Sequence, residues 1–233
     1  AYTAIQITDV FMLGWYSADA LAAVTLAAAI FFVFLIVGMG LCWAVTPIAA
    51  GAAEQKDIAG VRQATRMGLW IGVAFAALSM PVMLLAEPIF VRLLGQDPAL
   101  AALSGDYLAI AGWALFPAFL VAVMTAYLSA LERTQVVLWA TIGAAILNGF
   151  LNWVLIFGNL GAPELGIYGA AIGTAASYGV QAAMVLAALY RSKGLVRLRG
   201  LPGPRLSPLK PILKVSGPTF LERGIFQIGR AHV

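Results

Sequence analysis

The stretch Leu138–Gly158, LWATIGAAILNGFLNWVLIFG, decides the fold class of this 233-residue chain. It is 21 residues long and carries no charged side chain. An α-helix rises about 1.5 Å per residue, so the stretch is long enough to cross a hydrocarbon core of about 30 Å. We therefore expect a membrane-spanning helix here.

Two asparagines, Asn148 and Asn152, lie four residues apart inside this stretch. That spacing places both side chains on one face of a helix. Hydrocarbon offers no hydrogen-bond partner, so an amide that faces lipid is costly. The pair is expected to face other helices or a water-filled cavity. Two interpretations stay open from this pattern: hydrogen bonding between helices, or a site for a ligand or ion.

The composition extends the membrane assignment to the whole chain. Hydrophobic residues make up 62%, charged residues 10%, and the mean hydropathy is +0.94, whereas a soluble domain carries roughly a quarter charged residues. The apolar runs of about 20 residues differ from the alternating segments of about 10 residues in an outer-membrane barrel. We expect an all-α polytopic membrane protein, with a six-helix transmembrane lobe and the start of a seventh helix.

The predicted spans follow from apolar runs and the polar segments between them. Polar loops are expected at 51–66 and 91–106, with a helix start at Gln96–Pro98 and a kink at Pro117. The six spans are Ala1–Trp15, Leu21–Pro47, Met67–Phe90, Tyr107–Leu131, Leu138–Gly158 and Ile167–Tyr190, and a seventh begins near Val215.

The distribution of positive charge predicts the orientation. The loops after the second, fourth and sixth spans hold eleven Lys and Arg residues, and the opposite loops hold only Arg92. Cytoplasmic loops carry such an excess, so we expect a cytoplasmic (inner) membrane protein with a cytoplasmic N-terminus. The net charge of +4 follows this topology, and no nucleic-acid partner is expected. The eleven are Lys56, Arg62, Arg66, Arg133, Arg191, Lys193, Arg197, Arg199, Arg205, Lys210 and Lys214.

Both ends of the sequence look cut. The chain begins with Ala1 inside an apolar helix, and residues 228–233 resemble one reading frame of a sequencing adapter. We expect a transmembrane lobe at 1–190 with a truncated first helix, a basic cytoplasmic linker at 191–214, the start of a second lobe at 215–227 and a non-native tail at 228–233. The only histidine, His232, lies in that tail, so it is given no role.

Asp9 is the one acidic residue well inside an apolar helix. A carboxylate at the bilayer centre costs about 2.5–3.5 kcal/mol on insertion scales, so it is rarely there without a function. Because the start of its helix is missing, an interfacial carboxylate remains the alternative to a proton- or sodium-binding group. With one cysteine and no Walker loop, Ser-His-Asp set or metal-ligand cluster, no enzymatic activity and no cofactor are expected.

Further polar and small residues mark the sixth span and the first. Close packing against another helix is expected at Gly166, Gly169 and Gly173. Thr174 is divided between packing and ligand binding. Weaker candidates for a substrate cavity are Gln6, Ser177, Tyr178 and Gln181.

Four motifs in order resemble the N-terminal half of a multidrug and toxic compound extrusion (MATE) transporter. The first is TDVFMLG at 8–14 followed by DALAA at 19–23, and the second is GAAEQKDIAGVRQATRMG at 51–68. The third is ILNGFLNWVLIFG at 146–158, and the fourth is GIYGAAIGTAAS at 166–177. The resemblance covers nearly the whole chain. It implies twelve helices in two six-helix lobes, with substrate entering between them.

The resemblance also implies site residues. In the family, an aspartate of the first span and a polar pair of the fifth line a cation or proton site, which correspond to Asp9, Asn148 and Asn152. Thr174 corresponds to a polar residue of the sixth span. Many relatives have an aspartate in place of Asn152; with one fewer carboxylate, protonation of Asp9 becomes the simpler coupling. The amide carbonyls of Asn148 and Asn152 would still help to hold sodium.

The function expected from this resemblance is secondary-active antiport. The protein would export organic cations or other amphipathic drugs in exchange for protons or sodium, and its partners would be these substrates, membrane lipid and the missing C-terminal lobe. One alternative is a lipid-linked oligosaccharide flippase of related fold, although the predicted membrane interior has no Lys or Arg to bind a pyrophosphate. The other is a non-transporting membrane assembly protein, in which the polar side chains only join helices.

Overall fold

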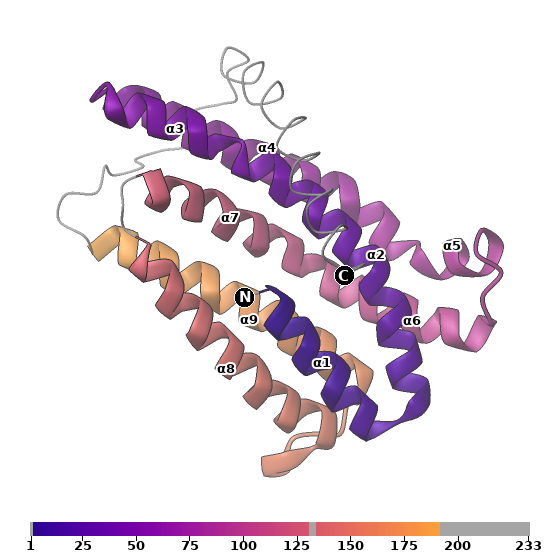
Figure 1. Ribbon diagram of the computed structural model, residues 1–233. Helices are drawn as coiled ribbons and strands as arrows, with labels where there is room; N and C mark the ends of the chain where they lie inside the picture. The colour runs from indigo at the N-terminus through magenta and orange to yellow at the C-terminus, as the bar shows by residue number, and fades with distance from the viewer. Residues whose placement is uncertain (1, 131–133, 192–233) are drawn as a thin grey trace, which may run out of the picture.

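The computed structural model describes residues 2–130 and 134–191, and every regular element in them is helical (Figure 1). The all-α polytopic fold class is thereby confirmed. The predicted linker, seventh helix and tail lie outside the described residues. The elements are α1 Tyr2–Tyr16, α2 Ala18–Trp43, α3 Val45–Glu54, α4 Ile58–Leu84, α5 Ala86–Arg92, α6 Pro98–Ala111, η1 Gly112–Ala114, α7 Leu115–Ala130, α8 Gln135–Phe157, η2 Asn159–Gly161 and α9 Ile167–Arg191.

Five helical segments of the described chain are long and apolar enough to cross a membrane. They are Ala18–Glu54, Ile58–Leu84, Pro98–Ser129, Gln135–Phe157 and Ile167–Arg191. The first predicted span corresponds to α1, which has 15 residues in the described chain and packs beside α2, α8 and α9. These elements match the six predicted spans in number and order.

Prolines explain where the long segments change geometry. Proline removes the hydrogen bond to the carbonyl four residues earlier and clashes with it. Trp43, four residues before Pro47, is the last residue of α2, and Leu84, four residues before Pro88, is the last residue of α4. Pro117 stands four residues after the centre of the 3₁₀ turn η1. The kink expected at Pro117 is therefore found one turn earlier, at Gly112–Ala114.

Two predicted polar loops are mostly helical, which corrects the sequence-based boundaries. The turn between α3 and α4 comprises only residues 55–57, and Asp57 caps α4 by accepting a hydrogen bond from the Gly60 amide at 2.9 Å. Asp97 caps α6 through the amides of Ala99 and Leu100, at 2.9 and 3.2 Å. The expected helix start at Pro98 is confirmed. The loops were overestimated because helices that leave the hydrocarbon keep their backbone bonds while their side chains turn polar.

The segment formed by α6, η1 and α7 lies in the middle of the bundle. It contacts α2 and α4 on one side and α9 on the other (Figure 1). Its residues are the most buried of the five long segments. Helix α1 packs against α2 and against both helices of the α8–α9 hairpin, so three helices surround its inner face. This arrangement brings side chains from distant parts of the sequence to one interior position.

The α8–α9 hairpin is held by a tight connection and by glycine packing. Gly158 ends α8 in the left-handed region at φ 68°, and the amide of Leu165 returns to the carbonyl of Leu155 at 2.9 Å. A Cβ on Gly169 would lie 2.6 Å from the carbonyl oxygen of Leu155, so the absence of a side chain lets the two backbones approach. The packing role expected for Gly169 is confirmed, whereas Gly166 meets the ring of Tyr16 instead of a backbone.

Candidate functional site

The described chain has one fully buried carboxylate, Asp9 of α1, which is 1% exposed. It accepts hydrogen bonds from four side chains of three other helices. Tyr107 of α6 donates its hydroxyl at 3.1 Å, and Thr174 of α9 donates at 2.5 Å. Asn148 and Asn152 of α8 donate their Nδ2 groups at 3.3 and 2.6 Å. The carboxylate therefore joins four helices at one point.

The donors divide between the two carboxylate oxygens by chemical type. Both amides donate to Oδ1, while both hydroxyls donate to Oδ2. An amide nitrogen can only donate, whereas a hydroxyl can either donate or accept. The Oδ1 side is therefore fixed, and the Oδ2 side can reverse its hydrogen bonds without moving any heavy atom.

Local sequence explains how the donors reach Asp9. Asn148 and Asn152 are one helical turn apart on the buried face of α8, which faces α1 and α9. A Cβ on Gly173 would collide with Oδ1 of Asn152, so this glycine gives the Asn152 amide its space. Thr174 follows directly and extends from α9 toward the carboxylate. The glycine that makes room for Asn152 and the threonine that donates to Asp9 thus occupy consecutive positions of α9.

The structure brings Asp9, Asn148, Asn152 and Thr174 together, as the sequence spacing and the family resemblance suggested. Their role as a cation- or proton-binding set stays a prediction. Tyr107 was missed, because an aromatic residue at the start of a predicted span is equally typical of a membrane interface. The signal available in the sequence was that Tyr107 follows the polar Ser104 by three residues, which places both on one face of a helix.

Two amide oxygens beside Asp9 have unused hydrogen-bonding capacity. Oδ1 of Asn148 and Oδ1 of Asn152 are buried and have no hydrogen-bond partner among the described residues. Oxygen is the ligand atom that hard cations such as sodium prefer, and the side chains of Asp9, Thr174 and both asparagines all carry it. Both asparagines, however, present Nδ2 and not Oδ1 to the Asp9 carboxylate. A cation beside the carboxylate would therefore require both amides to turn, and Asp9 would be its only charged ligand. In the described ranges no three His, Cys, Asp or Glu side chains gather as a transition-metal site.

The four weaker candidates lie at different places. Ser177 is buried and donates to the carbonyl of Gly173 at 2.6 Å. Gln181 is buried and donates to Thr141 of α8 at 3.0 Å, and Tyr178 is buried in the core. Gln6 is half-buried and lines a surface groove of about 280 Å³ between α1 and α2, with Ile7, Val10, Phe11 and Phe32.

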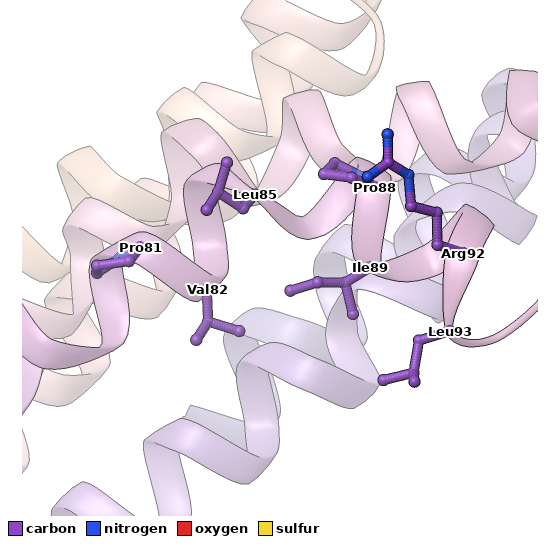
Figure 2. Close-up of a pocket in the computed structure, with 7 residues that line it drawn as sticks. All are labelled: Pro81, Val82, Leu85, Pro88, Ile89, Arg92 and Leu93. Atoms are coloured by element: carbon purple, nitrogen blue, oxygen red, sulfur yellow. The ribbon is translucent and has the colours of Figure 1, made fainter.

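A second groove of the described chain lies at residues that do not contact Asp9. It has a volume of about 390 Å³ and lies where α4 breaks into α5. Figure 2 shows its side chains: Pro81, Val82, Leu85, Pro88, Ile89, Arg92 and Leu93. Only Arg92 is polar, and its guanidinium lies beside Pro88 in that view. An apolar groove in a membrane helix is expected to face lipid, and nothing at this position suggests a chemical site.

A comparison with protein families identifies the family of this chain. A family model described as MatE matches residues 1–154, about two thirds of the chain. The chain belongs to the MatE family.

Relatives of this MatE-family chain carry transporter names. It is 46% identical over 172 residues to the "Probable multidrug resistance protein NorM" of Rhizobium meliloti (strain 1021), covering 74% of this chain and 37% of the relative. It is 34% identical over 226 residues to the protein of the same name from Bradyrhizobium diazoefficiens, covering 94% and 48%. The MatE-family chain thus spans half or less of the length of these curated relatives. Their names agree with the expectation that it is not an enzyme.

Solved structures share the fold. A crystal structure of MATE in the bent conformation superposes with a TM-score of 0.82 at 21% identity, covering 97% of this chain and 50% of that one. An inward-facing multidrug resistance MATE family transporter of the MOP superfamily gives a TM-score of 0.81, also at 21% identity, covering 95% and 50%. The fold of this MatE-family chain is therefore that of one half of a MATE transporter.

Proposed function

We propose that this chain is the N-terminal lobe of a multidrug exporter of the cytoplasmic membrane, driven by inward flow of protons or sodium. The observation that carries the proposal is the buried Asp9 carboxylate, held by four donors from α6, α8 and α9. A buried charge at a junction of helices is costly to keep for packing alone. A group that changes charge at such a junction can bias how the helices pack.

The donor arrangement supports a specific way of binding a proton. A proton on Oδ1 would face two amide N–H groups, which cannot accept it. A proton on Oδ2 faces the hydroxyls of Tyr107 and Thr174, either of which can turn from donor to acceptor. Protonation at Oδ2 therefore reverses a hydrogen bond between Asp9 and a hydroxyl of α6 or α9. The hydrogen bonds from Asn148 and Asn152 to Oδ1 stay in place. Ion binding is thus linked to α6 and α9 more than to α8.

The α1–α2 groove suggests how ion and substrate would be coupled. Gln6, Val10 and Phe11 line this groove, and Asp9 lies between them in sequence on another face of the same helix. An amide beside aromatic and aliphatic side chains suits an amphipathic drug, and a cation can lie over the ring of Phe11 or Phe32. A shift of α1 that follows Asp9 protonation would change the groove as well. Such a differential interaction is what linkage requires for coupling.

The test uses the complete protein in vesicles with imposed proton or sodium gradients. Asp9→Asn keeps the shape of the side chain and can still accept from the amides of α8, but it cannot exchange a proton. We expect gradient-driven drug export to be lost and substrate affinity to become independent of pH. The control is Asp19→Asn, which removes an exposed carboxylate of α2 and should leave export unchanged.

Export by Asp9→Asn with unchanged pH and sodium dependence would show that Asp9 is structural. The nature of the ion is tested by Asn152→Asp, which restores the second carboxylate seen in many relatives. Two carboxylates at this distance either share a proton or recruit sodium. If sodium is the coupling ion, this variant should export drug at lower sodium concentration than the wild type.

A further inference from the structure

A second polar contact between α8 and α9 lies away from Asp9. Nε2 of Gln181 donates to Oγ1 of Thr141 at 3.0 Å. Thr141 precedes Asn148 by seven residues, and Gln181 follows Thr174 by seven. Seven residues correspond to about 10.5 Å along a helix. Because the two helices are antiparallel, the contact is displaced from Asp9 toward the end of the lobe that carries Gln135 and Arg191.

Gln181 has an unused polar atom in the interior. Its side chain is 1% exposed, and its Oε1 has no hydrogen-bond partner among the described residues. If the amide of Gln181 were turned around, its NH₂ group would lack a partner in place of Oε1. One polar group of this side chain is therefore unsatisfied in either orientation. Buried polar groups of this kind are generally satisfied by water. At the Asp9 end of the α8–α9 interface, Oδ1 of Asn148 is also buried and has no hydrogen-bond partner among the described residues.

Ser177 stands between the two polar contacts on α9. It lies three residues after Thr174 and four before Gln181, so the steps are about 4.5 and 6 Å along the helix axis. Its hydroxyl donates to the Gly173 carbonyl, and its oxygen keeps capacity to accept. Steps of this length are those that a single bridging water spans. Asp9, Ser177, Gln181 and Thr141 thus form a line of polar side chains. It begins at fully buried Asp9 and ends at Thr141, which is partly exposed.

We propose that Ser177, Gln181 and Thr141 position the waters that carry protons between Asp9 and the Gln135–Arg191 end of the lobe. The proposal rests on proton coupling at Asp9. The proton leaves Asp9 Oδ2 for a water, and each carrier accepts one proton while it gives another to the next. An amide cannot relay a proton in this way without changing tautomer, so Gln181 only orients a water through Oε1. Thr141 holds the Gln181 amide in place.

The groups around this line leave it without a fixed positive charge. Apart from Asp9, the buried ionisable side chains that α6, α7 and α9 contribute in the described ranges are Tyr107, Tyr127 and Tyr178. None of the described Lys or Arg side chains is fully buried. A proton moving along the line therefore meets neutral groups.

The experiment measures proton-driven drug transport by the complete protein in liposomes. Gln181→Met keeps the length of the side chain and Thr141→Val keeps its shape, but both remove the polar group. We expect turnover to fall about tenfold in each, while KM for drug and the pH midpoint of drug binding stay at wild-type values. Thr141→Ser, which retains the hydroxyl, should restore turnover. Azide, a small weak acid that carries protons, should partly rescue Thr141→Val.

Wild-type turnover in both variants would overturn the proposal. So would a fall in turnover that is accompanied by a shifted pH midpoint of drug binding, since this would mean that the variants disturb the Asp9 site itself. Failure of the proposed function has a different signature. In that case wild type and Asp9→Asn would transport alike in the same liposomes, whatever the Gln181 and Thr141 variants do.

Discussion

At Asp9, four hydrogen bonds offset the burial of one carboxylate, and each donor comes from a side chain that is itself buried. A hydrogen bond to a charged group contributes about 1.5–3 kcal/mol, roughly twice the value for a neutral pair. Removing one donor therefore should cost more when Asp9 is present than when a neutral amide replaces it. This difference separates a charge-assisted contact from ordinary packing.

Tyr107→Phe tests that difference, because it keeps the ring and removes only the hydroxyl that donates to Asp9. We expect the free energy of unfolding to fall by about 1.5–3 kcal/mol in the wild type. In an Asp9→Asn background the loss should be smaller by about 1 kcal/mol or more. The measurement is a double-mutant cycle from reversible unfolding in mixed micelles.

Tyr168→Phe is the matched control for this cycle. It also removes a tyrosine hydroxyl that donates to an aspartate, here Asp106 at 2.6 Å, but both partners are exposed. Its cost should stay below about 1 kcal/mol and be the same in both backgrounds. Equal losses for Tyr107→Phe in the two backgrounds would contradict the charge-assisted contact.

The interior position of the asparagine pair could be predicted from the sequence because helical spacing fixes which residues share a face. For Asp9 the sequence left an interfacial position open, because the start of its helix is missing. Tyr107 could not be found in this way, since its contact with Asp9 joins residues 98 apart. Spacing within one helix says nothing about which neighbour it faces. Gln181 and Thr141 were visible as polar residues, but their pairing across α8 and α9 needs the packing of the hairpin.

Among the elements, the α8–α9 hairpin contains glycines that differ in how closely they pack against neighbouring atoms. Gly169 lies against the Leu155 backbone, whereas Gly179 has no atom within 4 Å of where a Cβ would be. Gly169→Ala should lower the free energy of unfolding by about 1–3 kcal/mol through overpacking. Gly179→Ala should leave it unchanged or raise it by up to about 1 kcal/mol, since alanine is the better helix former. Thermal unfolding in detergent measures both.

A Gly169→Ala variant as stable as Gly179→Ala would mean that the two backbones can separate without cost. The sequence identified the small-residue face of α9 but could not say which glycines use it. Helix boundaries were also misjudged around 51–66 and 91–106, because apolar runs report the hydrocarbon and not the length of the helix. Proline positions were only partial guides: Pro47, Pro88 and Pro117 each stand four residues after a break, whereas Pro81 lies inside α4 without one.

For the whole molecule, the charge distribution predicts which ends of the helices face the cytoplasm. Lys56 lies in the α3–α4 turn, and Arg62 and Arg66 lie in the first turns of α4, whereas Arg92 is at the opposite end. Single cysteines placed by Gln55→Cys and Pro163→Cys test the orientation, because both positions are exposed. The background is Cys42→Ala, which removes the only cysteine.

An impermeant maleimide should label the Pro163→Cys variant in intact cells. It should label the Gln55→Cys variant only after the membrane has been opened. The reverse labelling pattern would show that the orientation is opposite to the predicted one. Labelling of both variants in intact cells would mean that the lobe is not inserted as six spans. The orientation also decides whether the Gln135–Arg191 end of the proposed proton line faces the cytoplasm.

The length of the combined α2–α3 segment has a consequence for the depth of the lobe. Its 37 residues correspond to about 55 Å of helix, while the hydrocarbon is about 30 Å thick, and a tilt of about 20° shortens the projection by only a few per cent. In Figure 1 the α3–α4 tip extends past the neighbouring ends of α7 and α9. The tip carries Glu54, Lys56 and Asp57, all exposed. Drawing it into the acyl chains would cost about 2.5–3.5 kcal/mol for each charge, so we expect this overhang to prevent the lobe from sinking further into the bilayer.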